Sequence, residues 1–400
     1  MGAAPTAAEG AGTFLGTVDE DTRSWWQTHR EAFSLRSAGA VYALGILLVF
    51  FTVRASQLGR PNYLAASNVG NLLEQTSLIA IMAIGMTVLL ISGNFDLSVA
   101  SNAAMASMAA AMVIESVGPI GAVAFGLAVG TFGGLINGLI HWYVGLNSFI
   151  VTLGTLTAYR GIVLYMNDGQ EKVISREDSE VLKGWAGDFV GSIEPTLVIV
   201  IVAVATAIYF AVNNQRTQVI AAASIAAVAA GTTLATNYAI RIAHQALFML
   251  ILLAIVWFVL RFTVTGKRLY ATGGNQEAAR AAGIVVSRYT ILPFVIVGFC
   301  AGLAGVINLS RVGAVSPSLF TMRELEVIAS AIIGGVALTG GSGSVVKTIV
   351  GSSLLFVMTN GFTIIGLSPF ITEIAIGVLV IGAASLYVVA SRRAAAAGRI

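Results

Sequence analysis

A small set of hydrogen-bonding side chains lies within or beside long apolar stretches of this sequence. Asp96 is the most unusual, because it stands in the polar break Ser92–Ser98 between two apolar runs. A carboxylate at membrane depth costs about 2.5–3.5 kcal/mol, so Asp96 should have either a partner or a task. We expect it to cap the helix that follows, with a contact to a transported solute as the alternative.

Asparagines at other positions offer the same choice. An amide can hydrogen-bond the hydroxyl groups of a solute, or it can join one helix to another, and the sequence leaves both open. The candidates for lining a path through the protein are Asn94, Asp96, Asn137, Asn147, Asn308 and Asn360. Arg160 and Arg311 fall near expected helix ends, where we expect their guanidinium groups to extend to the membrane surface.

No motif for hydrolytic or metal chemistry is visible. A nucleotide phosphate loop requires G-x-x-x-x-G-K-S/T, but Gly266-Lys267 lacks the upstream glycine and the glycine-rich stretch 340–344 is followed by no suitably placed lysine. Cys300 is the only cysteine and is expected to be a small buried packing residue. The histidines are scattered: His29, His141 and His244. We therefore expect a chain that is not an enzyme and carries no metal or cofactor of its own.

The most informative polar segment is the loop 263–288. Gly273-Gly274 should form a turn, Asn275 should cap a short helix from Gln276 to Ala282, and Gly283 should end it. Such a helix could dock into a soluble protein and transmit its movement, or it could be a solvated connection, and the residues alone favour neither. The docking candidates are Gly274, Asn275, Glu277, Ala278, Ala279, Arg280 and Gly283.

Composition places the whole chain in a lipid bilayer. Of its 400 residues 57% are hydrophobic and 10% charged, where a soluble domain carries about 25% charged residues. The net charge is +3 with no dense basic face, which argues against nucleic-acid binding. We expect an all-α bundle of 10–12 spans over 38–390, between an N-terminal tail 1–37 and a C-terminal tail 391–400.

Apolar segments long enough to cross a membrane define the expected helices. Two of them, 96–115 and 324–341, are weak because they are rich in small and polar residues, and either could be broken or re-entrant. The segments are 38–54, 72–92, 96–115, 119–143, 147–167, 195–212, 218–236, 243–262, 289–311, 324–341, 345–366 and 369–390.

Basic residues predict the orientation. The loop 263–288 contains Lys267, Arg268, Arg280 and Arg288, so the positive-inside rule places it in the cytoplasm. Both tails carry arginines and should lie on the same side, which agrees with an even number of spans. The loop 168–194 should then lie outside.

Four ordered stretches resemble the permeases of the ribose/xylose branch of bacterial ATP-binding-cassette (ABC) sugar importers. LISGNFDLSV at 90–99 resembles that family's T/S-G-G-I-D-L-S-V signature, from which it departs at Asn94 and Phe95. NSFIVTLGT at 147–155 and IIGGVALTGGSGS at 332–344 resemble two further signatures, and the loop 263–288 resembles the family's coupling segment. The extra apolar pair at 195–236 resembles the xylose subgroup, which suggests D-xylose as the substrate.

The resemblance implies a division of labour in the cell membrane. Two copies of the chain would form the pore, an ATPase subunit carrying ATP and Mg²⁺ would dock on the coupling segment, and an extracytoplasmic sugar-binding protein would deliver the sugar. Ribose or another sugar is an alternative substrate. An ion-coupled transporter using Asp96 or Glu373 is a less favoured alternative, and a membrane enzyme would need clustered catalytic groups, of which none is visible.

Overall fold

The computed structural model describes residues 35–187, 189–193, 240–368, 370–379, 381–382 and 385. Contacts divide the chain into two units, Met1–Gly39 and Ala40–Ile400; the described part of the first is the start of helix α2. The expected spans 195–212 and 218–236 and the C-terminal tail lie outside the described residues, as does nearly all of the N-terminal tail.

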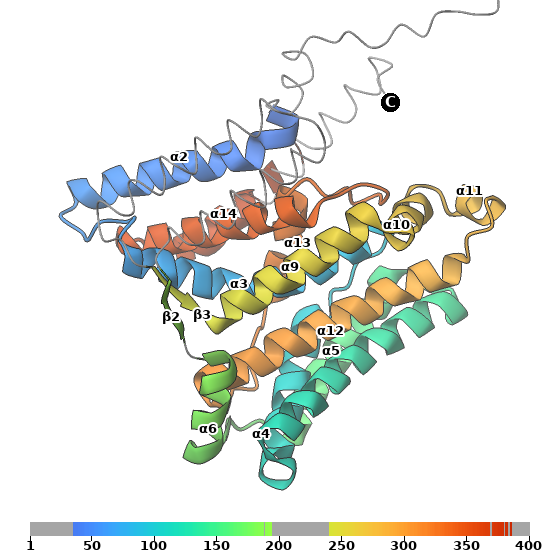
Figure 1. Ribbon diagram of the computed structural model, residues 1–400, viewed down its shortest axis with the longest axis horizontal. Coiled ribbons are helices and arrows are strands. Elements are labelled where there is room, and N and C mark those ends of the chain that lie inside the picture. The colour runs from blue at the N-terminus through green and yellow to red at the C-terminus, as the bar shows by residue number, and fades with distance from the viewer. Residues whose placement is uncertain are drawn as a thin grey trace, which may run out of the picture. The chain divides into compact units, whose positions relative to one another are not determined.

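Helices make up most of the described chain, as the composition predicts, and two short antiparallel strand pairs, β1–β4 and β2–β3, join connecting segments (Figure 1). The elements are α2 (Leu35–Gln57), α3 (Ala66–Ile91), α4 (Val99–Leu139), η1 (Ile140–Val144), α5 (Ser148–Met166), β1 (Lys172–Val173), α6 (Arg176–Leu182), η2 (Lys183–Gly187), β2 (Phe189–Ile193), β3 (Ile240–Ala243), α9 (His244–Phe262), α10 (Val264–Gly274), α11 (Gln276–Ala281), α12 (Val286–Val312), β4 (Ala314–Val315), α13 (Arg323–Ile333) and α14 (Val345–Ile364).

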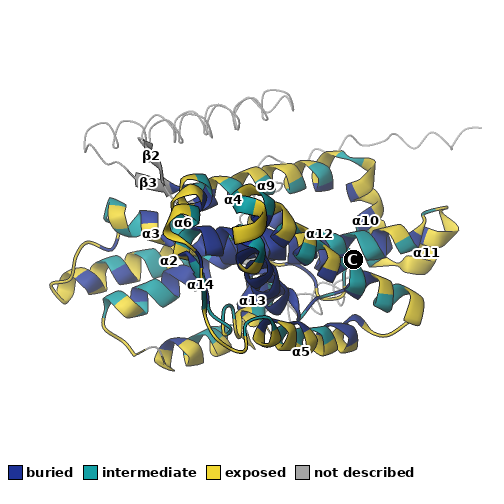
Figure 2. Ribbon diagram, turned by 90° about the horizontal axis from the view of Figure 1, so that it is seen from below, coloured by how far each residue is buried: buried dark blue, intermediate teal, exposed yellow. Residues whose placement is uncertain are grey.

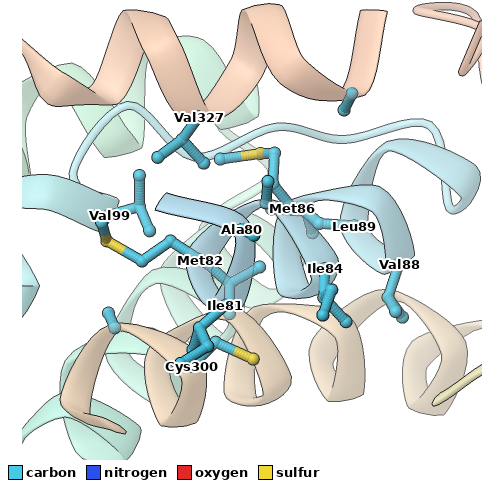
Figure 3. Close-up of a cluster of buried hydrophobic side chains, with 14 of the residues drawn as sticks. Ala80, Ile81, Met82, Ile84, Met86, Val88, Leu89, Val99, Cys300 and Val327 are labelled. Carbon is cyan, nitrogen blue, oxygen red and sulfur yellow. The ribbon is translucent and has the colours of Figure 1, made fainter. Parts of the chain in front are cut away.

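Helix α3 is the core of the bundle. From Leu78 to Ile91 it is almost wholly apolar, as expected of a helix surrounded by protein, and it packs against α12, α14, α13 and α9. Its side chains meet Cys300 of α12 on one side and Val327 of α13 on the other (Figure 3), and Cys300 is fully buried, as predicted from the sequence. Buried residues accordingly gather in the middle of the bundle (Figure 2).

The surrounding helices expose large apolar side chains instead. Ile46 on α2 is 68% exposed, Tyr165 on α5 is 86% exposed and Phe258 on α9 is 56% exposed. In water such a surface would be an aggregation hazard, whereas in a bilayer these side chains contact lipid tails. The protein is therefore a multi-pass membrane protein.

Helix α4 is a tight hairpin of two limbs. Gly118 has a left-handed φ of 72°, and Pro119 follows it, so the helix breaks there and the second limb runs back along the first. The limbs correspond to the expected segments 96–115 and 119–143. Both pack on α12 through glycines: a Cβ added at Gly130 would lie 2.5 Å from the Cα of Gly302, an approach that only glycines permit.

Seven helices among the described residues are long and apolar enough to cross a membrane. Of the twelve expected segments, two lie outside the described residues, two are the antiparallel limbs of α4 and count here as one helix, and 369–390 is described only in part, with a helix over Phe370–Leu379.

The expected span 324–341 is wrong as a full crossing. Helix α13 ends at Ile333 because Gly334 and Gly335 follow, and Gly335 takes a φ of 84°. Its 11 residues reach only about 16 Å, half of a hydrocarbon core of about 30 Å. The short helix is flanked by two irregular segments, 316–322 and 334–344, and matches the broken-helix alternative predicted for this region.

The two ends of the bundle differ in character. Helices α10 and α11 lie at one end, here called the basic end because of Lys267, Arg268, Arg280 and Arg288. The α4 hairpin turn and α6 lie at the opposite end (Figure 1). Helix α11 is exposed over most of its surface (Figure 2), so the basic end presents it to any soluble partner.

Candidate functional site

Helix α11 forms with the caps that the sequence predicts. The Asn275 side chain accepts a hydrogen bond from the Ala278 amide at 2.9 Å, and Gly283, with a φ of 79°, ends the segment. The helix itself closes at Ala281, one residue before the expected end. Glu277, Ala278 and Arg280 are exposed, but Ala279 is buried against the chain itself. Whether Ala279 and the other candidates contact a partner stays a prediction.

The expected turn at Gly273-Gly274 is wrong. Both residues continue helix α10, whose start is capped by the Thr263 side chain accepting from the Gly266 amide at 3.2 Å. Glycines usually favour turns, but here their missing side chains serve packing instead. A Cβ on Gly273 would collide with the carbonyl oxygen of Ile91, the last residue of α3.

Three of the quoted sequence signatures meet at this point. The Gly341 amide, from the signature at 332–344, donates to the Ile91 carbonyl oxygen at 2.9 Å. The Tyr270 hydroxyl, from α10, donates to the Gly343 carbonyl oxygen at 2.8 Å. The end of α3, helix α10 and the segment 334–344 are thus joined at the C-terminal end of α10, which α11 follows in the chain.

Asp96 is held by the chain's own donors. It is fully buried, and its Oδ1 accepts from the Ser98 amide at 2.7 Å and the Ser98 hydroxyl at 2.6 Å. The Asn137 amide, from the second limb of α4, donates to Oδ2 at 3.1 Å. Ser98 occupies the N-cap position of α4. Asp96 lies two residues earlier and closes a turn there, so it is not the N-cap that we expected.

Burial and hydrogen bonding act on Asp96 in opposite directions. Burial raises the pKa of this carboxyl, and the donors from Ser98 and Asn137 lower it. Nearby, the Tyr159 hydroxyl donates to the Gly133 carbonyl oxygen at 2.8 Å, so α5 joins the same buried region. Tyr159 also donates to Asn137 Oδ1 at 3.5 Å, and the arrangement of Asp96, Ser98 and Asn137 is that of a structural clasp between the 92–98 segment and α4.

The remaining candidates for a path do not converge with this set. Asn147 caps α5 at an exposed position, accepting from the Phe149 amide at 2.9 Å. Asn360 of α14 pairs with Asn68 of α3 through two hydrogen bonds of 3.1 Å. Asn94 is buried and makes long contacts of 3.4 Å to Ser92.

Asn308 differs from the other candidates. It lies on α12, is 7% exposed, and its Oδ1 has no hydrogen-bond partner among the described residues. Whether any of the asparagines contacts a solute stays a prediction.

The two arginines expected at the membrane surface point into the protein instead. Arg160 donates to the carbonyl oxygens of Pro317 and Leu319, both at 2.9 Å. Arg311 pairs with Glu74 of α3 at 3.5 Å. The irregular segment 316–322 leaves backbone carbonyls without helical partners, and a half-buried guanidinium group satisfies two of them.

The segment that Arg160 holds is strained. Phe320 and Met322 have φ values of 58° and 66°, a left-handed conformation that costs non-glycine residues about 1–3 kcal/mol each. Such strain persists only where surrounding contacts impose it. Sequence reasoning missed this segment, since its composition, Ser-Pro-Ser-Leu-Phe-Thr-Met, carries only the weak turn signal of a proline between serines.

The described residues offer no group of three or more His, Cys, Asp or Glu side chains that could hold a metal ion. Whether α11 contacts a partner stays a prediction.

Comparison with known proteins identifies relatives over most of the chain. The family model described as branched-chain amino acid transport system / permease component matches residues 68–384. The ribose import permease protein RbsC of Escherichia coli is 29% identical over 322 residues, 80% of this chain and 85% of that protein. The xylose transport system permease protein XylH of Haemophilus influenzae is 32% identical over 341 residues, 82% and 89% of the two chains.

A third sugar appears among the relatives. The D-allose transport system permease protein AlsC of Escherichia coli is 28% identical over 350 residues, 87% of this chain and 90% of that protein. No solved structure matches the chain.

Proposed function

We infer the function from the family of this chain, which belongs to the branched-chain amino acid transport system permease components and within them to the ribose/xylose-type permeases of ABC sugar importers. We propose that it carries D-xylose into the cytoplasm as half of a homodimeric pore. ATP and Mg²⁺ bind to a separate ATPase subunit, and a sugar-binding protein delivers the sugar from outside. Sugar permease function itself follows from the family and its relatives.

The observation that carries the proposal is the exposed helix α11 at the basic end. A short helix with both termini capped is rigid enough to act as a docking element. It is also joined through α10 to α3, the most deeply buried helix. A displacement of α11 would therefore be passed to α3 at the centre of the bundle. The charged pair Glu277 and Arg280 on its exposed face supplies polar contacts to the ATPase.

The distribution of basic residues supports the orientation. Positive charge gathers around α10 and α11, and the positive-inside rule places that end in the cytoplasm together with both chain termini. The opposite end, with α6 and the α4 hairpin turn, then faces the binding protein. ATP-driven closure of the ATPase subunits would move α11 and switch the pore between its two open states.

D-xylose is favoured over the other sugars by one feature of the sequence. Xylose permeases are among the relatives, at 31–32% identity, beside ribose and allose permeases that are similarly close at 28–29%. The feature is the apolar stretch 195–236, which resembles the longer xylose subgroup. D-ribose and D-allose are the competing substrates.

Uptake of labelled D-xylose tests the proposal. Cells that lack the gene are compared with cells in which it is restored, with D-ribose and D-allose as competitors and with ATP depletion set against a protonophore. We expect restored uptake that follows ATP and is inhibited least by the other two sugars. Uptake that stops with the protonophore but not with ATP depletion would refute the importer mechanism. Uptake of D-ribose alone would identify D-ribose as the substrate and leave the mechanism unchanged.

A further inference from the structure

Five glycines bring three chain segments into direct backbone contact at the basic end. Gly93 follows α3, Gly273 and Gly274 end α10, and Gly340 and Gly341 lie in the segment 334–344; together they are called the glycine joint below. A Cβ added at Gly340 would lie 2.6 Å from the Gly273 carbonyl oxygen, and one at Gly341 would lie 2.7 Å from the Cα of Gly274.

Hydrogen bonds hold the joint closed. The Gly341 amide donates to Ile91 at 2.9 Å, and the Tyr270 hydroxyl donates to Gly343 at 2.8 Å. Gly93, Gly340 and Gly341 all have left-handed φ values between 73° and 84°, which glycine adopts without strain. The joint is thus a backbone-on-backbone contact, with no flexible side chain between its parts to absorb a displacement.

The segment 334–344 leads from the joint directly into helix α13. Gly334, at the end of α13, lies against the backbone of Lys347 and Thr348 at the start of α14, where a Cβ would approach to 2.6 Å. At its other end α13 begins at Arg323, directly after Met322 of the strained segment that Arg160 holds. One short helix therefore connects the joint to the strained segment.

We propose that the glycine joint transmits displacement of α11 to α13, so that Gly273 and Gly341 are positioning residues for the strained segment 316–322. The inference rests on the proposed function, since it needs an ATPase partner that moves α11. Close-packed interiors transmit such shifts rather than absorbing them, and a strained segment at the far end supplies an element with two arrangements. The accessibility of 316–322 then depends on the nucleotide state of the partner.

A cysteine reporter tests the proposal without reference to any sugar. Ser318 is exposed, whereas the native Cys300 is fully buried, so Ser318→Cys introduces the reactive thiol within the described residues. The permease is purified with the ATPase subunit of its own transport system and reconstituted in liposomes. Labelling by a membrane-impermeant maleimide is then timed without nucleotide and after trapping with ATP and vanadate.

Neighbouring glycines provide matched variants. Gly273→Ala places a methyl group on the Ile91 carbonyl and must open the joint, whereas the Cβ of Gly274→Ala meets only the Gly341 Cα, at an ordinary 3.9 Å. We expect the labelling rate to differ between the two nucleotide states by about fivefold in the reporter protein. Gly274→Ala should keep that difference and Gly273→Ala should abolish it.

A second variant covers the case in which Gly273→Ala does not accumulate in the membrane. Tyr270→Phe removes only the hydroxyl that bonds Gly343, and it should reduce the nucleotide response by about half or more. The proposal is overturned if the reporter ignores nucleotide, if Gly273→Ala responds like Gly274→Ala, or, where Gly273→Ala is absent, if Tyr270→Phe responds normally. The complex could show the expected nucleotide-dependent labelling, kept in Gly274→Ala and lost in Gly273→Ala, and still import none of D-xylose, D-ribose and D-allose. That result would refute the proposed substrate and leave the glycine joint in place.

Discussion

Exchanging the side chains of Asp96 and Asn137 tests whether this buried pair is a structural clasp. In Asp96→Asn an amide replaces the carboxylate, and either orientation of that amide turns an N–H₂ group toward an existing donor: Asn137 in one case, Ser98 in the other. The change loses a charge-assisted bond worth about 1.5–3 kcal/mol and leaves a buried donor unsatisfied, offset in part because no charge is buried. We expect a net loss of about 2 kcal/mol.

The reverse single change should be worse. Asn137→Asp sets a second carboxylate opposite Asp96 at the present separation of 3.1 Å. Two unit charges at that distance repel by about 5 kcal/mol at an effective dielectric constant of about 20, an upper limit because the pair would take up a proton. The double variant restores one carboxylate facing one amide, so it should recover most of the loss. The coupling energy between the two positions should then be about 3 kcal/mol or more.

Thermal unfolding in detergent, followed by size-exclusion chromatography of the heated samples, measures the four proteins. A loss of about 2 kcal/mol should lower the midpoint of this 400-residue chain by about 2–3 °C, giving the order wild type, double variant, Asp96→Asn, Asn137→Asp. Equal midpoints for wild type and Asp96→Asn, or a double variant no better than Asn137→Asp, would show that the hydrogen bonds are not what holds this region. A raised KM for sugar in a double variant of normal stability would instead give Asp96 a contact with solute.

Three further predictions concern other parts of the molecule. Gly130→Ala should lower the unfolding midpoint by about 1–4 °C, because α4 and α12 must separate by about 0.9 Å to bring the new methyl group to an ordinary contact, at a cost of about 1–3 kcal/mol. Gly154→Ala, whose new methyl group faces open space, should leave the midpoint unchanged. Arg160→Gln should release the strained segment and reduce sugar transport per ATP hydrolysed by about tenfold with little loss of protein from the membrane, and a normal ratio would show that the arginine only fills space. Glu277→Arg combined with Arg280→Glu should leave the permease in the membrane but uncouple ATP hydrolysis from transport, and normal transport by that double variant would exclude both charges from the docking surface.

Local sequence rules predicted the long helices well, because a helix that faces lipid and a helix that faces protein need the same apolar residues. The predicted 289–311 became Val286–Val312, and 147–167 became Ser148–Met166. The start of α3 at Ala66 was missed by several residues, since Asn68 and Asn71 interrupt the apolar run. Two polar side chains of α3 find partners on other helices, Asn68 on Asn360 and Glu74 on Arg311.

Contacts between distant segments could not be predicted from local rules. Gly273 looked like a turn residue because the sequence does not reveal that Ile91 of α3 lies against it. Arg160 looked like a surface anchor because its partners are backbone carbonyls, which carry no sequence signal of their own. Asp96 was singled out correctly by its cost in an apolar setting, but the identity of its donors required the fold of the α4 hairpin.

The distribution of glycines bears on the proposal that α13 moves while its neighbours stay fixed. Along α4 and α12, glycines such as Gly130 and Gly302 occur within regular helices, and their close approach extends over several turns on each side, so shifting one contact would disturb all of them. At the glycine joint the same close approach is confined to helix ends and an irregular segment, with α13 only 11 residues long beyond it. A displacement applied at α11 therefore meets a long interface on the α4–α12 side and a short one on the α13 side. The short helix should yield first, which makes α13 and the strained segment the natural moving parts of the permease.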